Sequence, residues 1–170
     1  MKICLLISLS VLVFVQSSRG QGTIPNRQID YAAFLKSAQE VRAIREGRRL
    51  TEDQFLQMMG QEGVVLLDAR SAAKFKMRHL RGAVNLSLPD FDAASLGKII
   101  PRKDTRVLIY CNNNFAGSPV SFPTKVAGAS LNISTFVTLS TYGYTNVYEL
   151  GPIIDTRISK LPFGGDELSK

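Results

Sequence analysis

Apolar and polar positions along the chain follow a pattern typical of an open α/β layer fold. Two continuous apolar runs, Val64–Leu67 before Asp68 and Arg106–Tyr110, predict central strands of a parallel sheet that is buried on both faces. Shorter runs at Ala83–Leu86 and Val147–Leu150 predict two further strands.

Helical patterns separate these strands. They cover three segments between the predicted strands, Ser71–Arg78, Asp90–Leu96 and Ile133–Thr141. Ahead of the first strand, Thr51–Gln54 has the form of a capping box and precedes a short apolar stripe of Phe55, Met58 and Met59. Strands that alternate with helices predict an α/β fold, an open parallel sheet flanked by helices.

The N-terminal segment has the form of a secretory signal. Lys2 supplies the positive start, Ile3–Val15 the apolar stretch and Ser18–Gly20 a small-residue cleavage site. The apolar stretch has about 13 residues, fewer than the roughly 20 that a helix needs to span a bilayer. We therefore expect cleavage after Gly20, a periplasmic or secreted protein, and membrane contact only through this signal.

Four parts follow from these patterns. Residues 1–20 are the predicted signal peptide, and residues 21–47 form an N-terminal extension, a polar tether and then a helix with apolar residues at helical spacing from Tyr31 to Val41. Residues 48–163 form the predicted domain, and residues 164–170 a C-terminal tail. The pattern from Ser159 to Lys170 predicts a short, frayed end.

The chain is basic, with 21 Lys and Arg residues against 14 Asp and Glu residues and a net charge of +7. Its sharpest cationic cluster consists of Arg42, Arg45, Arg48 and Arg49. No aromatic residues interleave with this cluster, and an exported protein seldom meets chromosomal DNA. We therefore expect no nucleic-acid partner and interpret the cluster as a solvated helix face.

The chain has two cysteines, and Cys4 lies in the predicted signal segment. Cys111 is then left without a partner for a disulfide, at the point where a predicted strand meets a run of three asparagines. A lone thiol at a strand end is a candidate nucleophile. One histidine, His79, and one remaining cysteine are too few for a zinc site of nitrogen and sulfur ligands, so we expect no metal and no cofactor.

Four segments together resemble the rhodanese-like family. They are Leu67–Arg70, Arg78–Asn85, Tyr110–Cys111 and Gly143–Leu150, and their order and spacing match over about residues 48–151. The resemblance implies one rhodanese-like domain with Cys111 at the active position and His79 in the scaffold. It also implies sulfur transfer through a persulfide on Cys111, which needs a small sulfur donor and a thiol acceptor.

The resemblance assigns the catalytic position, and the loop and inserted stretch beside it supply the other expected site residues. Cys111 is the expected catalytic residue, and the expected substrate-binding residues are Asn112, Asn113, Asn114, Phe115, Ala116 and Lys125. Asp68 and Arg70 are expected to support the site, the carboxylate by fixing loop amides and the guanidinium by local pairing.

The loop after Cys111 departs from the family pattern. The familiar pattern resembles Cys-Arg/Lys-x-Gly-x-Arg, whereas Asn112 and Ala116 are neutral here, so we expect thiosulfate to be a poor donor. Asn114 occupies the glycine position, where asparagine can adopt a positive φ, and the three asparagines can equally be ordinary turn residues. Related cysteine-dependent phosphatases need an arginine where this chain has Gly117, which argues against phosphatase activity.

A second departure is an inserted stretch, Ser118–Asn132, which carries three Pro or Gly breaks. One hypothesis makes it a lid, with Phe115 and Phe122 shielding the sulfur and Lys125 supplying the missing cation. The alternatives are a simple surface elaboration and a core position for Phe122.

Three functions remain open on the sequence. The first is an exported sulfurtransferase that carries sulfane sulfur on Cys111. The second is a non-catalytic binding module for a peptide or small ligand, because fold does not fix function. The third is redox sensing, in which Cys111 would form an intermolecular disulfide.

Overall fold

The structure is a computed structural model that describes residue 24 and residues 26–168. The predicted signal peptide and residues 21–23 and 25 of the predicted tether lie outside the described residues. The chain divides into two units, residues 1–30 and 31–170. In the first unit, the amide of Ile29 donates to the carbonyl of Asn26 (N···O 3.3 Å) and closes a short turn. The described helices and strands all belong to the second unit.

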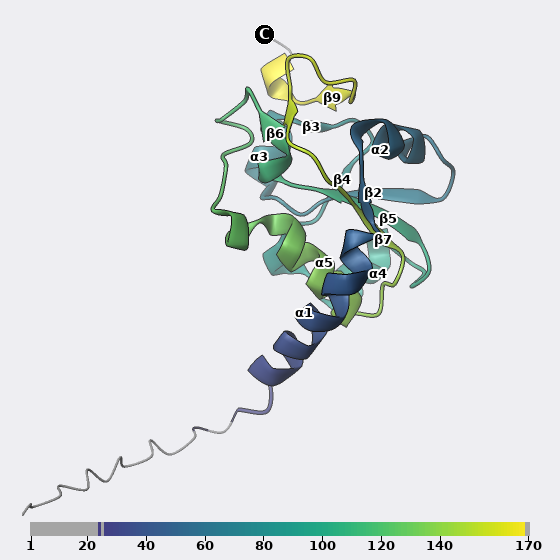
Figure 1. Cartoon of the computed structure of the whole chain (residues 1–170), viewed down its shortest axis with the longest axis vertical. Helices are drawn as coiled ribbons and strands as arrows, with labels where there is room; N and C mark the ends of the chain where they lie inside the picture. The colour runs from purple at the N-terminus through teal and green to yellow at the C-terminus, as the bar shows by residue number, and fades with distance from the viewer. Residues whose placement is uncertain (1–23, 25, 169–170) are drawn as a thin grey trace, which may run out of the picture. The chain divides into compact units, whose positions relative to one another are not determined.

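A five-stranded parallel sheet forms the centre of the second unit (Figure 1). The strands, in spatial order, are β1 (Arg49–Leu50), β7 (Val147–Leu150), β5 (Arg106–Tyr110), β2 (Val64–Asp68) and β4 (Val84–Asn85). All neighbouring pairs are parallel. The four predicted strands and the open parallel sheet are thus confirmed, and β1 is an additional edge strand. Because β5 is the middle strand, the residue that follows it lies at the centre of the sheet's carboxyl edge.

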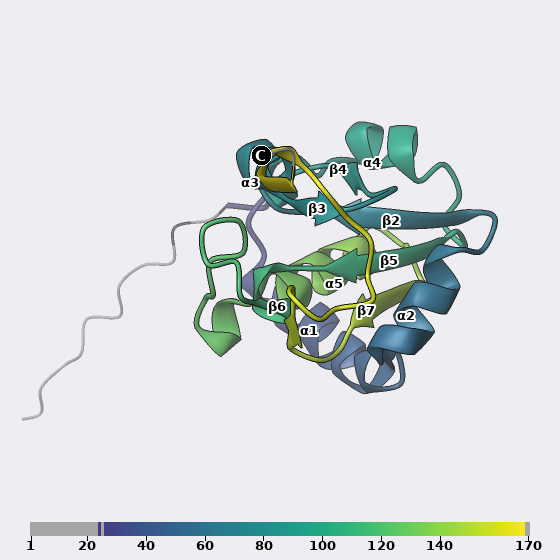
Figure 2. The same cartoon turned by 90° about the horizontal axis from the view of Figure 1, so that it is seen from above.

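Helices and loops bury both faces of this sheet (Figure 2). The helices are α1 (Tyr31–Glu46), α2 (Glu52–Met59), α3 (Ala72–Met77), α4 (Ala93–Ile99) and α5 (Leu131–Thr141). Val107 and Ile109 of β5 pack in a core with residues of α1, α4 and α5. Leu108 and Tyr110 pack in a second core with Phe55 of α2 and the C-terminal segment. Successive side chains of β5 thus point to opposite faces of the sheet, as expected for a strand.

Side-chain caps decide where helices α2 and α4 begin. At α2 the predicted capping box forms, because the amide of Gln54 donates to the Thr51 hydroxyl (3.3 Å) and the amide of Thr51 donates to the Gln54 side chain (2.9 Å). The helix predicted from Asp90 begins later, at Ala93. Asp92 caps it by accepting the Ser95 amide (2.7 Å), and a 3-10 turn precedes it.

The C-terminal segment is part of the fold, so the prediction of a frayed end from Ser159 is wrong for residues 159–168. Strand β9 (Phe163–Gly164) pairs antiparallel with β3 (His79–Leu80). The side chains of Leu161 and Phe163 are buried in the second core. Polar residues around these two apolar side chains concealed the strand in the sequence.

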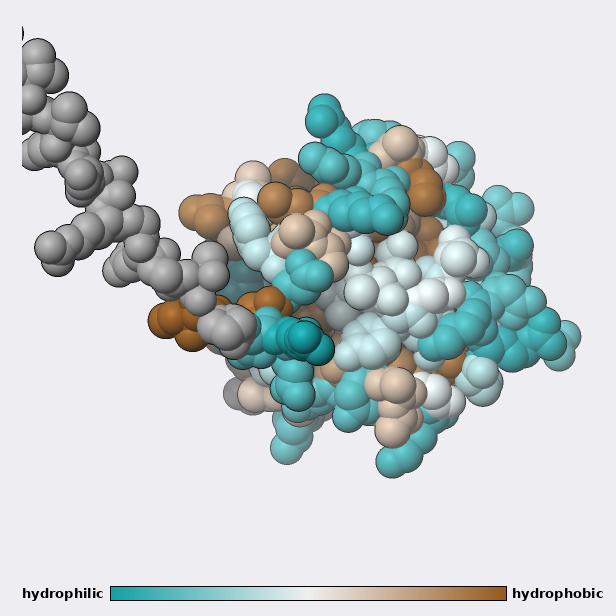
Figure 3. Space-filling model, turned by 90° about the horizontal axis from the view of Figure 1, so that it is seen from below, coloured by the Kyte–Doolittle hydropathy of each residue, from teal (hydrophilic) through white to brown (hydrophobic). Residues whose placement is uncertain are grey.

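Helix α1 packs along α5, with Val41 buried between them and the sheet. Its first half exposes Tyr31, Phe34 and Leu35. On the face shown in Figure 3, hydrophobic groups are separated by hydrophilic side chains. Among the described residues, no helix combines the length and apolar character needed to cross a membrane.

Candidate active site

The Cys111 thiol lies at the carboxyl end of β5. It is a free cysteine with 1% of its surface exposed. Its sulfur lies 3.5 Å from the hydroxyl oxygen of Ser130, the residue before α5. The carboxyl edge of an open parallel sheet is where ligands bind, so the thiol occupies the position where this fold offers a site.

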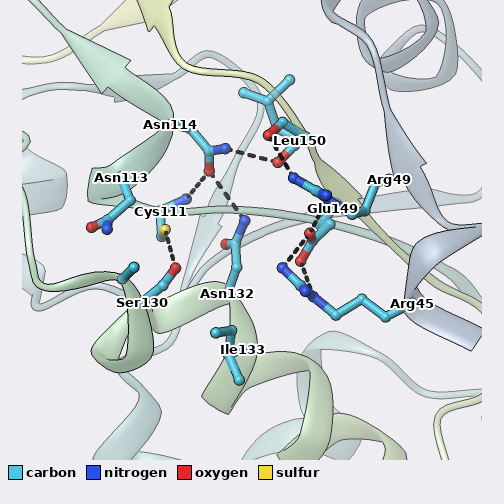
Figure 4. Close-up of a pocket in the computed structure, with 12 residues that line it drawn as sticks. Arg45, Arg49, Cys111, Asn113, Asn114, Ser130, Asn132, Ile133, Glu149 and Leu150 are labelled. Atoms are coloured by element: carbon cyan, nitrogen blue, oxygen red, sulfur yellow. Dashed lines mark hydrogen bonds and ion pairs between the residues drawn. The ribbon is translucent and has the colours of Figure 1, made fainter. Parts of the chain in front are cut away.

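A cavity of about 210 Å³ opens beside the thiol (Figure 4). Its walls come from segments far apart in the sequence, including Arg45, Arg49, Asn114, Ser130, Asn132 and Glu149. Figure 4 shows Cys111 and Ser130 on one side and the two arginines with Glu149 on the other. The amides of Asn114 and Asn132 lie between them. The cavity therefore combines a nucleophile, two cations and several amide groups.

The Asn114 side chain fixes the loop that carries the thiol. Its oxygen accepts hydrogen bonds from the Cys111 amide (2.9 Å) and from the Asn132 side chain (3.1 Å). Its nitrogen donates to the carbonyls of Leu150 (2.7 Å) and Pro152 (3.2 Å). Within the described residues only glycines have a positive φ, so the left-handed conformation suggested for Asn114 does not occur. Side-chain hydrogen bonds, in a 3-10 turn, hold the loop instead.

Glu149 is the anionic centre of the cavity. Its carboxylate accepts from Arg45 Nε (3.0 Å) and Arg45 Nη2 (2.6 Å), and Arg49 Nε lies 3.3 Å from it. The Glu149 side chain is 1% exposed, whereas those of Arg45 and Arg49 are 22% and 42% exposed. Burial raises the pKa of the Glu149 carboxyl, and the two guanidinium groups oppose that rise. A second carboxylate, that of the exposed Glu46, lies 3.7 Å from Arg49, so the two guanidinium groups serve one buried and one exposed carboxylate.

Sequence reasoning missed Arg45 and Arg49 as site residues, because it interpreted their cluster as a solvated face. That interpretation fits the exposed Arg42 and in part Arg49, which is also exposed, but not Arg45; both Arg45 and Arg49 line the cavity. One signal was present in the sequence: Glu149 interrupts the apolar run of β7. A buried carboxylate requires a cationic partner.

The predicted replacement cation, Lys125, lies in a second cavity. This space of about 310 Å³ is lined by Lys125 together with Asn112, Arg70, Lys74 and apolar side chains, and Cys111 is not part of its wall. The backbone of Lys125 is tied to the loop, since its amide and carbonyl both bond to the Asn113 side chain (3.1 and 2.8 Å). The loop asparagines are thus split between the two cavities.

The aromatic residues proposed as a shield for sulfur are core residues. Phe115 and Phe122 are 3% and 1% exposed and pack against each other (ring centroids 4.5 Å apart) in the second core with Phe163. Neither lines the Cys111 cavity. Ala116 is exposed in β6 (Phe115–Ala116), which pairs with β8 (Ile154–Asp155). The inserted stretch therefore packs Phe122 into the second core, while Ala127, Ser130 and Asn132 of the same stretch line the Cys111 cavity.

Asp68 and Arg70 form a closed, buried ion pair on the other face of the sheet. Arg70 Nη2 lies 2.5 Å from the Asp68 carboxylate, which also accepts the Tyr110 hydroxyl (2.6 Å). The remaining guanidinium donors reach the carbonyls of Ser121 (3.0 Å) and Arg78 (2.7 Å). Burial, and then the nearby Asp68 carboxylate, raise the pKa of the Tyr110 hydroxyl well above its usual value, so it stays a neutral donor. This network ties β2 to the inserted stretch.

The His79 ring contacts Phe75. Its Nδ1 lies 2.7 Å from the carbonyl oxygen of Phe75, and its ring stacks on the Phe75 ring with centroids 4.0 Å apart. It lines neither of the two cavities around the cysteine loop. This environment agrees with a scaffold role.

The fold and the position of the thiol define an open parallel α/β domain with a single free cysteine at the end of its middle strand. The sequence model of the rhodanese-like domain family matches residues 51–151, and the chain belongs to this family. Arg45 and Arg49 lie outside the matched segment.

Solved structures of low sequence identity are similar to this chain. The rhodanese-like domain of an Anabaena protein, determined by NMR in solution, is 15% identical and covers 72% of this chain and 83% of its own, with a TM-score of 0.50. A rhodanese with anions from E. coli is 21% identical and covers 61% of this chain and 99% of its own, with a TM-score of 0.42. Comparison with curated proteins gave no match.

Proposed function

We propose that this protein is a sulfurtransferase that carries sulfane sulfur as a persulfide on Cys111. The observation that carries the proposal is a free thiol at the carboxyl end of the middle strand, facing a cavity with two guanidinium groups. A persulfide is anionic, and an electropositive environment favours an anion on sulfur. Membership of the rhodanese-like family supports the same chemistry.

The proposed cycle is redox-neutral. The Cys111 thiolate attacks the outer sulfur of a donor persulfide, a new S–S bond forms, and the donor leaves as a thiolate with the electron pair of the broken S–S bond. A thiol acceptor then attacks the outer sulfur on Cys111, and the pair of electrons returns to the cysteine sulfur. The Ser130 hydroxyl, 3.5 Å away, is placed to donate a hydrogen bond to the sulfur anion.

Thiosulfate remains a poor donor in this proposal. The loop residues that would carry positive charge in the familiar pattern are Asn112 and Ala116, and Asn112 does not line the cavity of the thiol. The proposed partners are a small sulfur donor other than thiosulfate and a thiol acceptor.

Intact-mass measurement tests the sulfur-carrier function directly. After incubation with inorganic polysulfide and removal of excess reagent, the protein should gain the mass of one sulfur atom, located at Cys111 by peptide mapping. The Cys111→Ser variant is the matched control and should gain none. Absence of the added sulfur, under conditions that load a known rhodanese, would exclude the proposal.

A binding module is the second candidate, and the amide bonds of the loop favour it. The Cys111 amide donates to the Asn114 side chain (2.9 Å), and the amide of Asn114 donates to the Cys111 carbonyl (3.2 Å). The Cys111 amide is then unavailable to an anion on sulfur. A ligand whose affinity is the same for the wild type and Cys111→Ser would support this function.

We also propose that the protein is exported, with cleavage after Gly20 and a periplasmic or secreted location. The support is the sequence pattern of residues 1–20. Expression of the full chain with its N-terminal segment, followed by N-terminal sequencing of the mature protein, tests the proposal. A mature chain that begins at Gln21 is the expected result, and an uncleaved Met1 would contradict it.

A further inference from the structure

The cations of the Cys111 cavity come from the segment that precedes the family domain. Arg45 belongs to α1 and Arg49 to β1, and both lie before residue 51, where the family match begins. A guanidinium has five N–H donors, and Arg45 uses two of them on Glu149. Arg49 directs one toward Glu149 (3.3 Å) and one to the Gly151 carbonyl (3.3 Å), and its Nη1 lies 3.7 Å from the Glu46 carboxylate. Donors therefore remain for the carboxylate of a ligand, which arginine binds with charge-assisted hydrogen bonds.

A second feature of the cavity is an acceptor without a partner. The Asn132 side chain is buried, with 4% of the residue exposed, and its oxygen Oδ1 accepts no hydrogen bond from the described residues. Figure 4 places this oxygen on the side of Cys111 and Ser130. A buried acceptor without a donor is unfavourable, so a ligand N–H group that reached it would be bound favourably.

The orientation of the Asn132 amide is fixed by its neighbours. Asn114 donates from Nδ2 to two carbonyls, so its Oδ1 must face Cys111 and Asn132. Asn132 can then offer only its own Nδ2 to that oxygen. If the Asn132 amide were flipped, its oxygen would face the Asn114 oxygen, and two acceptors would meet without a hydrogen between them. The unpaired oxygen of Asn132 therefore stays toward the cavity.

The cavity thus offers cations for an anion and an acceptor for an N–H donor. We propose that it selects a small amino-acid thiol as the sulfur acceptor, with the carboxylate on Arg45 and Arg49 and the ammonium group on Asn132. This inference rests on the proposed sulfur-carrier function. The cavity of about 210 Å³ leaves room for a small ligand.

The transfer step balances without another reactant. The thiolate of the amino acid attacks the outer sulfur of the Cys111 persulfide and forms the new S–S bond. The old S–S bond breaks, and its electron pair stays on the Cys111 sulfur as a thiolate. An anion that offers only acceptors, such as sulfite, can pair with the arginines but leaves Asn132 unsatisfied.

Three matched acceptors test the ligand class. The protein is first loaded with sulfur from polysulfide, and the loss of that sulfur to an added thiol is followed by intact mass. Cysteine carries both charges, mercaptopropionate only the carboxylate, and cysteamine only the ammonium group. Each rate is divided by the rate of the same thiol with a small-molecule persulfide, which removes intrinsic reactivity. We expect cysteine to exceed each of the others by about tenfold, the effect of one charge-assisted contact. Equal normalised rates would overturn the inference.

Variants assign the contacts. Arg49→Gln should lower the cysteine-to-cysteamine rate ratio by about tenfold, and Asn132→Ala should lower the cysteine-to-mercaptopropionate ratio similarly. Lys36→Gln removes the same charge from an exposed position of α1 away from the cavity and should leave both ratios unchanged. Ratios that do not move in either cavity variant would contradict the assignment.

A binding measurement separates this inference from the sulfur-carrier function. S-methylcysteine cannot accept sulfur but carries both charges, so it should protect Cys111 from alkylation by iodoacetamide better than methylthiopropionate or methylthioethylamine. If the protein never loads sulfur but shows this protection, the sulfur-carrier function is rejected and the proposed ligand class is retained. If the protein loads sulfur but shows no preference among the three thioethers, the sulfur-carrier function is retained and the proposed ligand class is rejected.

Discussion

Two buried carboxylates hold arginines on opposite faces of the sheet, and they differ in how completely they are satisfied. Asp68, at the end of β2, and its partner Arg70 are 0% and 1% exposed, and both partners are closed in by further hydrogen bonds. Glu149, in β7, is equally buried, but its two arginines are partly exposed and border a cavity. The closed pair ties the fold together, whereas the open one leaves donors for a ligand.

The closed pair should have the largest effect on stability. Asp68→Asn leaves the Arg70 guanidinium buried without a counter-charge, and the loss of one partner of a buried pair costs about 3–5 kcal/mol. Urea unfolding measures this change in the free energy of unfolding. A loss below about 1 kcal/mol would mean that Arg70 does not depend on Asp68.

Tyr110→Phe removes a hydroxyl group from the same hydrogen-bond network. The hydroxyl donates to Asp68 (2.6 Å) and accepts from the Leu80 amide (3.1 Å), so the variant leaves a buried amide without its acceptor. We expect a loss of about 1–3 kcal/mol in the free energy of unfolding. An unchanged denaturation midpoint would show that water replaces the hydroxyl.

Arg49→Gln separates stability from function at the open pair. Its side chain is 42% exposed and makes a single 3.3 Å contact with Glu149, while Arg45 retains its two hydrogen bonds. Exposed pairs contribute about 0–1 kcal/mol, so thermal stability should barely change although acceptor selectivity falls. A large loss of stability would make Arg49 a structural residue like Arg70.

Glu149 predicts a distinctive pH dependence. Because its pKa is raised on folding, the folded protein keeps a proton that the unfolded chain releases above the ordinary value of 4.5. The stability contribution of this group is therefore full below pH 4.5 and is lost as the pH rises through the raised pKa. Glu149→Gln should flatten that part of the curve of unfolding free energy against pH. An identical curve in wild type and variant would contradict the raised pKa.

Lys125→Ala should have the smallest effect. The side chain is exposed and does not line the cavity of the thiol. We expect the rates of sulfur loading and discharge to change by less than about twofold, equivalent to a fraction of a kcal/mol. A tenfold fall with an anionic donor would restore Lys125 as the replacement for the missing loop cations.

The sequence predicted the main strands and the position of the thiol because both depend on local patterns. Continuous apolar runs gave β2 and β5, and the Thr51–Gln54 capping box gave the start of α2. The four-segment resemblance then gave the family. These signals lie in short windows, where side-chain period and capping chemistry dominate.

The rest depends on contacts between distant segments. Nothing near Arg45 indicates that it pairs with Glu149, and nothing near Phe163 indicates that β9 closes on β3. Both pairings are decided by tertiary packing, which overrides weak local patterns. The helix predicted from Asp90 begins at Ala93 for a local reason, since Asp92 and Ser95 form the capping box.

The pairing of Arg45 with Glu149 joins residues that are 104 positions apart in the sequence. A chain made from its N-terminus completes α1 and β1 first, yet the strand that β1 pairs with, β7, is synthesised near the end. Contacts of such long range form late, because the loop between them must first be closed. A nascent or truncated chain would therefore hold Cys111 without the walls around it, and its thiol should gain ligand selectivity only when folding is complete.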